Sequence, residues 1–178
     1  MSFIVTTDSG CDLPIELLNE RKIIPYMLSY DIDGQTFVDT MRHEDCHAFY
    51  EKMRGGAVPK TSQINPQEFV DFWRPMLKAG EPIIHISLGS GVSGTWHNGE
   101  LAARMLESEA PGAKIFVLDS TLCSTGYGML ALKAAEMRDA GASAEECFRW
   151  LDEHKININT WYTTDALVYL RRSGRCSR

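Results

Sequence analysis

The stretch that most constrains the fold of this chain is residues 83–95, IIHISLGSGVSGT. Its first half is mostly β-branched and apolar, which is typical of a buried strand. Glycines and serines follow at once and predict a loop, and a helix is expected to begin near Ser93. The first N–H groups of a helix have no intrahelical partner and lie at the positive end of its dipole, so this arrangement forms a natural anion site. Ser90, Ser93 and Thr95 would add hydroxyl donors.

The rest of the chain alternates strands and helices in the same way. Strands are predicted near residues 3–7, 23–30, 35–38, 83–88, 114–118 and 158–163, and helices near residues 14–20, 45–54, 66–78, 94–108, 127–140, 143–154 and 166–172. This alternation predicts an α/β fold with a mainly parallel sheet and helices on both faces. Ligands of such sheets bind beyond the carboxyl ends of the strands. We therefore expect Asp8-Ser9, Ser90–Ser93 and Asp119-Ser120 to share one edge of the fold.

Composition narrows the classes of function. The chain has 178 residues, of which 44% are hydrophobic and 24% charged, so it is long enough for one globular domain with a core. A net charge of −6 argues against nucleic acid as a partner. No apolar run approaches the roughly 20 residues of a membrane helix, and the first residues lack the basic region of a signal peptide. Five scattered cysteines without C-x-x-C spacing favour a reduced, cytoplasmic protein.

One motif points to zinc. Residues 43–47, HEDCH, match the H-E-x-x-H signature, in which His43 and His47 would bind the metal and Glu44 would act as base. Glu68 would be a conceivable third ligand. The predicted helix begins only at Asp45, however, and the segment is polar, as a solvated first turn would be. No metal site is expected, and a zinc-dependent hydrolase stays as an alternative function.

The glycine-serine loop suggests two further activities. Residues 91–95, GVSGT, come close to the G-x-S-x-G nucleophile elbow, but Thr95 stands where the last glycine belongs. His85 lies within the predicted strand and is expected to be packed rather than catalytic. A serine hydrolase that uses Ser93 is the second enzyme alternative. Residues 89–94 also fit G-x-G-x-x-G, but on an internal strand, and the lysine of a P-loop is absent.

Several stretches, taken in order, resemble the DegV family. They are VTTDS and CDL (residues 5–9 and 11–13), TSQINP (61–66), SLGSGVSGT (87–95), Asp119-Ser120 with GYG (126–128), and YLRRSGR (169–175). These stretches cover almost the whole chain, and their order and spacing make the resemblance specific. The chain departs from the family pattern at Ile64, where the family normally carries proline.

The resemblance implies a three-layer DegV N-terminal domain over residues 1–165, with residues 166–178 beginning a link to a second domain beyond this chain. It also implies a fatty-acid-binding protein rather than an enzyme, with no cofactor. The residues expected to hold the carboxylate of a long-chain fatty acid are Thr61, Ser62, Ser93, Gly94 and Thr95, supported by the loops at Asp8-Ser9 and Asp119-Ser120. The tail would lie in an apolar tunnel that the second domain helps to close.

The resemblance implies partners as well. Proteins of this kind present the carboxylate to the separate, ATP-dependent catalytic subunit of a bacterial fatty acid kinase, which makes an acyl phosphate. Arg171 and Arg172 in the basic C-terminal run are the expected docking residues. A transient contact with a membrane surface is also expected. A third interpretation is an interaction domain whose basic tail docks another partner.

Overall fold

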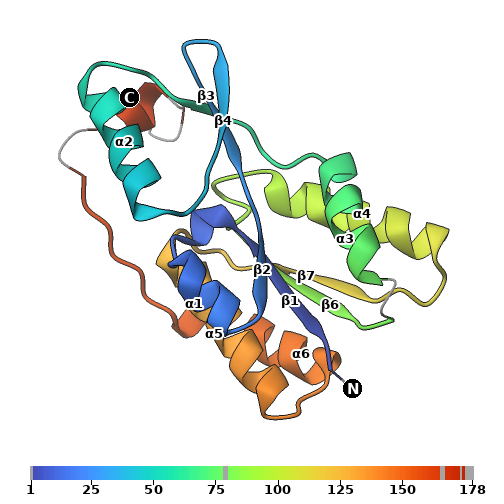
Figure 1. Ribbon diagram of the computed structural model, residues 1–178. Helices are drawn as coiled ribbons and strands as arrows, with labels where there is room; N and C mark the ends of the chain where they lie inside the picture. Colours follow the sequence, from blue (N-terminus) through green and yellow to red (C-terminus); the bar gives the residue numbers. More distant parts are fainter. Residues whose placement is uncertain (1, 78–79, 165–166, 173, 175–178) are drawn as a thin grey trace.

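The computed structural model describes residues 2–77, 80–164, 167–172 and 174 (Figure 1). Its centre is a four-stranded parallel sheet in the order β2-β1-β6-β7. The strands are β1 (Ile4–Asp8), β2 (Ile23–Tyr26), β6 (Ile83–Ser87) and β7 (Ile115–Asp119). The predicted α/β fold with a mainly parallel sheet is therefore confirmed.

Helices cover both faces of this sheet (Figure 1). One face carries α1 (Ile15–Glu20), α5 (Thr125–Asp139) and α6 (Ala144–His154), and the other carries α3 (Pro66–Leu77) and α4 (Thr95–Glu109). Each face has its own buried cluster. Val5, Ile84 and Ile86 pack toward α5 and α6, whereas Ile83 and Val117 pack toward α3 and α4. The alternation of these side chains along β6 is what a strand buried on both sides requires.

His85 occupies the middle of β6 and is fully buried. Its Nδ1 lies 3.0 Å from the hydroxyl oxygen of Thr6, and the ring meets Phe69 and Trp73 edge-on. Burial lowers the pKa of His85 to about 3, because the charged ring would lose its water. His85 is thus a neutral packing residue, as the sequence predicted.

A smaller antiparallel sheet stands beside the main one, in the order β4-β3-β5. Its strands are β3 (Ser29–Ile32), β4 (Gln35–Val38) and β5 (Lys60–Thr61), and α2 (His43–Arg54) lies next to it (Figure 1). The single strand predicted over residues 23–30 was wrong, because the chain leaves the main sheet after Tyr26. At this break the Leu28 amide donates to the Ser9 hydroxyl and the Leu28 carbonyl accepts from Asp39.

The strand predicted over residues 158–163 was also wrong. A short 3-10 helix, η2 (Lys155–Asn157), is followed by irregular chain through Thr164. Trp161 and Tyr162 in this segment are 95% and 83% exposed, so their side chains are not packed on the sheet. The segment leads to α7 (Val168–Arg172), where the Tyr169 hydroxyl donates to the Met53 carbonyl of α2. Within the described residues, no helix is both long and apolar enough to span a membrane.

A buried polar contact joins α5 to the end of β1. The Tyr127 hydroxyl donates to Asp8 Oδ1 at 2.6 Å, and the Gly10 amide donates to the same oxygen at 3.0 Å. The second oxygen, Oδ2, is buried and has no hydrogen-bond partner within the geometric limits among the residues that the structure describes. Burial raises the pKa of Asp8 to about 6, although the hydrogen bonds from Tyr127 and Gly10 act to lower it. The start of α5 is thereby fixed at the carboxyl edge of the sheet.

Replacing Asp8 by asparagine should change how stability depends on pH. The folded pKa of about 6 lies above the ordinary 3.8, so Asp8 favours folding most at low pH, and this contribution is lost as pH rises through the folded pKa. Asparagine keeps the carbonyl acceptor but does not titrate. A shift of about two units is worth about 3 kcal/mol, so the unfolding free energy of Asp8→Asn relative to wild type should rise by up to that amount between about pH 4 and pH 7.

Urea denaturation of both proteins at several pH values measures this difference. Asp31→Asn, at an exposed carboxylate in β3, is the matched control for exchanging a carboxylate for an amide. A difference for Asp8→Asn that does not vary with pH would contradict a raised pKa.

Candidate functional site

The loop after β6 is held to the loop after β7 by one carboxylate. The Ser90 amide and hydroxyl donate to Asp119 at 3.0 and 2.6 Å, and the Thr121 amide donates to it at 3.0 Å. Although partial burial acts to raise it, hydrogen bonds from Ser90 and Thr121 keep the pKa of Asp119 below its usual value. Gly89 is needed here, because a Cβ would lie 2.8 Å from the Thr121 carbonyl carbon. Asp119 therefore fixes the loop that leads into α4.

The N-terminus of α4 lies at the end of this loop. Gly94 is the N-cap and offers no side chain to the first helical amides. The Ser93 hydroxyl lies 2.9 Å from the Thr95 hydroxyl and accepts from the Thr95 amide at 3.2 Å. Thr95 is buried, Ser93 is half-buried and Gly94 is exposed. Hydroxyl and backbone donors thus gather where the helix dipole favours an anion.

The loop that follows β5 lies directly beside this helix. Thr61 pairs with Tyr30 of β3, and both Thr61 and Ser62 are exposed. The side-chain amide of Gln63 lies so close to Gly94 that a Cβ there would overlap its oxygen. Asn98 of α4 donates from Nδ2 to the Ile64 carbonyl at 2.8 Å. The structure therefore brings together two predicted loops that lie about 30 residues apart in the sequence.

The predicted supporting residues make hydrogen bonds within the fold. Ser9 is buried and its hydroxyl accepts from Leu28. Ser120 is also buried, and its hydroxyl bonds to the backbone of Leu122. Ser120, like Asp8 and Asp119, thus holds a loop in place, whereas Ser9 accepts one hydrogen bond and also lines the cavity described below. The predicted docking residues Arg171 and Arg172 are exposed on α7.

A cavity of about 200 Å³ lies beside Thr61, between the small sheet and α2. Its apolar and aromatic lining residues are Leu28, Tyr30, Val38, Phe49 and Tyr50, and its acidic ones are Asp12, Asp39 and Asp45. Tyr30, Phe49 and Tyr50 meet edge to face. Sequence reasoning missed this cavity, because the hairpin and the helix that line it show no shared pattern.

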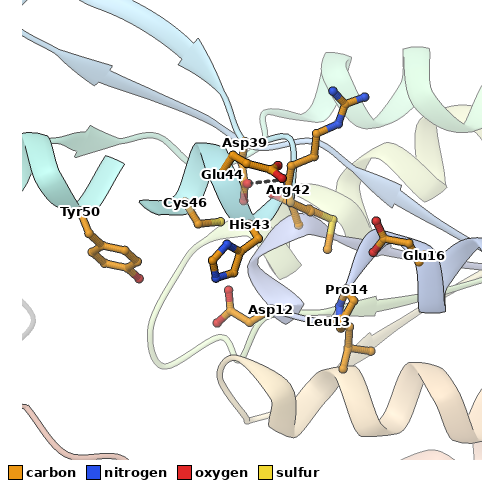
Figure 2. Close-up of a pocket in the computed structure, with 12 residues that line it drawn as sticks. Asp12, Leu13, Pro14, Glu16, Asp39, Arg42, His43, Glu44, Cys46 and Tyr50 are labelled. Atoms are coloured by element: carbon orange, nitrogen blue, oxygen red, sulfur yellow. Dashed lines mark hydrogen bonds between the residues drawn. The ribbon is translucent and has the colours of Figure 1, made fainter. Parts of the chain in front are cut away.

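A neighbouring cavity of about 530 Å³ contains part of the zinc-like motif (Figure 2). Helix α2 begins at His43, so the predicted start at Asp45 was wrong and both histidines belong to a formed helix. The helix starts earlier because Arg42 is its N-cap, with its carbonyl accepting from Cys46. Figure 2 shows His43 pointing toward Asp12. Among the described residues, however, no three His, Cys, Asp or Glu side chains form a group that could hold a metal ion.

The serine-hydrolase arrangement does not form around Ser93. In the described part of the chain, the hydrogen bonds of its hydroxyl go to Thr95, and none joins it to a histidine. His85, the histidine nearest in sequence before it, is buried within β6. An activated serine needs a base within hydrogen-bond reach, and Ser93 has none here.

The chain matches known proteins along nearly its whole length. A family model described as "Uncharacterised protein, DegV family" matches residues 2–178. A DegV domain-containing protein of Clostridium perfringens is 34% identical over 176 residues, which is 98% of this chain and 60% of that protein. Another, from Caldanaerobacter subterraneus subsp. tengcongensis, is 36% identical over 177 residues, again 98% and 60%. The chain therefore spans about 60% of the length of these curated relatives.

Solved structures give the same result. A DegV family protein from Thermus thermophilus, whose structure concerns fatty acid binding, matches with a TM-score of 0.84 and 29% identity over 98% of this chain and 61% of that one. DegV from Bacillus subtilis, a fatty acid binding protein, matches with a TM-score of 0.80 and 29% identity over the same shares. The family match over almost every residue, together with the shared parallel sheet, shows that this chain belongs to the DegV family.

Proposed function

We propose that this chain binds a long-chain fatty acid and holds its carboxylate between the Thr61-Ser62 and Ser93-Gly94 loops. The observation that supports this most is the contact between the two loops at the start of α4, where the N-cap residue Gly94 has no side chain. Fatty acid binding is also what is described for the DegV proteins of Thermus thermophilus and Bacillus subtilis, each 29% identical to this chain.

The carboxylate would be held by neutral donors. Hydroxyl groups of Thr61, Ser62 and Ser93 and the amides that follow Thr95 in the first turn of α4 suit an anion, and each hydrogen bond to a charged group contributes about 1.5–3 kcal/mol. The hydroxyls that face Asp119 and Leu122 are already used within the fold, so they are not part of this set.

The alkyl tail would supply most of the affinity, since each buried CH₂ contributes about 0.8 kcal/mol. The cavity beside Thr61 offers aliphatic and aromatic walls for the first part of the tail. Its three aspartates would repel a carboxylate, which favours placing the charged end at the loops. Because ligand pockets usually measure about 300–1,000 Å³, this cavity of about 200 Å³ would take only part of a long tail.

We further propose that the bound acid is presented to a separate kinase subunit. A carboxylate oxygen would attack the γ-phosphorus of ATP held by that subunit, forming an acyl phosphate and releasing ADP. The basic residues Arg171 and Arg172 are exposed on α7 and would dock an acidic surface of the partner. The binding subunit needs no base of its own for this step.

Purified protein should carry or accept one fatty acid. Mass spectrometry under non-denaturing conditions should find a mass increase of one long-chain fatty acid per chain, either as purified or after addition of myristate. A protein that is free of lipid and also takes up no myristate would count against the proposed function.

Removing a hydroxyl from either loop should weaken binding of the acid selectively. If a charge-assisted hydrogen bond is lost, Thr61→Val and Ser93→Ala should each raise the Kd for myristate by about 10- to 150-fold. Binding of the neutral analogue tetradecanol should hardly change. Matched controls are Thr36→Val in β4 and Ser108→Ala near the end of α4, both exposed and outside the two loops. An equal loss of affinity for myristate and for tetradecanol would show that these hydroxyls do not bind the carboxylate.

Reversing the charge of α7 should impair transfer of phosphate to the bound acid. Arg171→Glu with Arg172→Glu should slow acyl phosphate formation by a fatty acid kinase catalytic subunit about tenfold or more at low salt, because rim charges act mainly on association. Myristate affinity should not change. Arg104→Glu with Arg149→Glu, at exposed positions on α4 and α6, is the matched control. Similar rates of acyl phosphate formation for the two double variants would show that α7 is not part of the docking surface.

A further inference from the structure

The two halves of the proposed carboxylate site, the Thr61-Ser62 loop and the Ser93-Gly94 loop, come from separate elements. The distance between them therefore depends on contacts that join these elements. The Thr61-Ser62 half follows β5, and its far end is fixed to α3 by a capping box. In that box the Glu68 amide donates to the Asn65 side chain at 3.0 Å, and the Asn65 amide donates to the Glu68 carboxylate at 2.7 Å. These bonds hold the loop to α3 but not to α4, where the other half begins.

Asn98 makes the direct connection to α4. It lies in the first turn of that helix, where its amide donates to the Gly94 carbonyl at 3.2 Å. Its side-chain Nδ2 donates to the Ile64 carbonyl at 2.8 Å. A carbonyl oxygen only accepts, so the nitrogen of the Asn98 amide must be the atom that faces it. One residue thus bonds to the backbone of both halves.

The acceptor is itself firmly placed. The Ile64 side chain is 2% exposed and packs in the cluster formed with Phe69 and Trp73, so its carbonyl does not move without disturbing the core. On the other side of the contact, the Gln63 side chain lies against the Cα of Gly94. The loop therefore contacts the start of α4 through Gln63 and is hydrogen-bonded to this helix through the Ile64 carbonyl.

We propose that Asn98 is a positioning residue for carboxylate recognition: it sets the separation of the Thr61-Ser62 and Ser93-Gly94 loops without touching the ligand. This inference rests on the proposed function. Without the side-chain amide, the Thr61-Ser62 loop keeps its bonds to β3 and α3 but loses its connection to α4. Donors from the two halves then no longer converge on one carboxylate, while the apolar contacts with the tail are unaffected.

The test compares acid with alcohol, because loss of the carboxylate geometry should affect only the acid. Equilibrium dialysis of the full chain with labelled myristate and tetradecanol gives the ratio of the two affinities. In wild type the acid should be favoured about tenfold or more, and Asn98→Ala should lower this preference about fivefold or more, with tetradecanol binding within about twofold of wild type. Asn98→Asp should lower it further, since a carboxylate would face the Ile64 carbonyl. Asn19→Ala, at an exposed asparagine of α1, is the matched control.

A second readout does not depend on ligand. Amide hydrogen exchange across residues 61–65 should be faster in Asn98→Ala than in wild type, while exchange in β6 is unchanged. If Asn98→Ala keeps the full preference for myristate, the inference is wrong and the proposed function stands. A parallel loss of acid and alcohol binding, with faster exchange in β6, would make Asn98 a general stability residue and also overturn the inference. If wild type itself does not prefer myristate to tetradecanol, the proposed carboxylate site fails, and the role of Asn98 fails with it.

Discussion

The parallel pairing of β1, β6 and β7 is the constraint on which the rest of the structure depends. Because these strands run in the same direction, their carboxyl ends meet at one edge, and the chain must leave each of them there. Asp8 ends β1, and Asp119 ends β7 opposite Ser87 of β6. The loops that follow are then close enough for a single carboxylate, Asp119, to hold two of them. The position of the helix start at Gly94 therefore depends on the contacts of Asp119 at this edge of the sheet.

The pattern of apolar and β-branched residues was sufficient to predict a strand such as β6, which is buried on both faces. The run from Ile83 to Ser87 is buried on both faces. It contains three isoleucines among its five residues, so it was identified as a strand. The same rule failed at residues 158–163, which are also rich in strand-forming residues. Whether such a run forms a strand depends on whether its side chains can be buried against a sheet, and here Trp161 and Tyr162 face solvent although β7 is an edge strand. The break after Tyr26 was missed for a similar reason, since it is set by the Leu28 contacts with Ser9 and Asp39.

The residues of the candidate site were proposed from sequence, but which of their side chains are already bonded within the fold follows only from the structure. Motif resemblance singled out the hydroxyl-rich loops, and the structure places two of them in contact. The sequence does not distinguish Ser90 and Ser120, whose hydroxyls are used to hold loops, from Ser62, which is exposed. That distinction depends on partners far away in the chain, such as Asp119 for Ser90. Asn98 carries no motif at all, and its importance follows only from its contact with a carbonyl 34 residues away.

The chemistry of the site sets a limit on what it can do alone. Its donors are hydroxyls and backbone amides, which stabilise an anion but take no proton from it. In the described residues Ser93 has no base beside it, and the nearby carboxylate of Asp119 is held in its ionised form by Ser90 and Thr121. In the proposed function such a site would orient the carboxylate and partly desolvate it, and the electrophile would be brought by another protein.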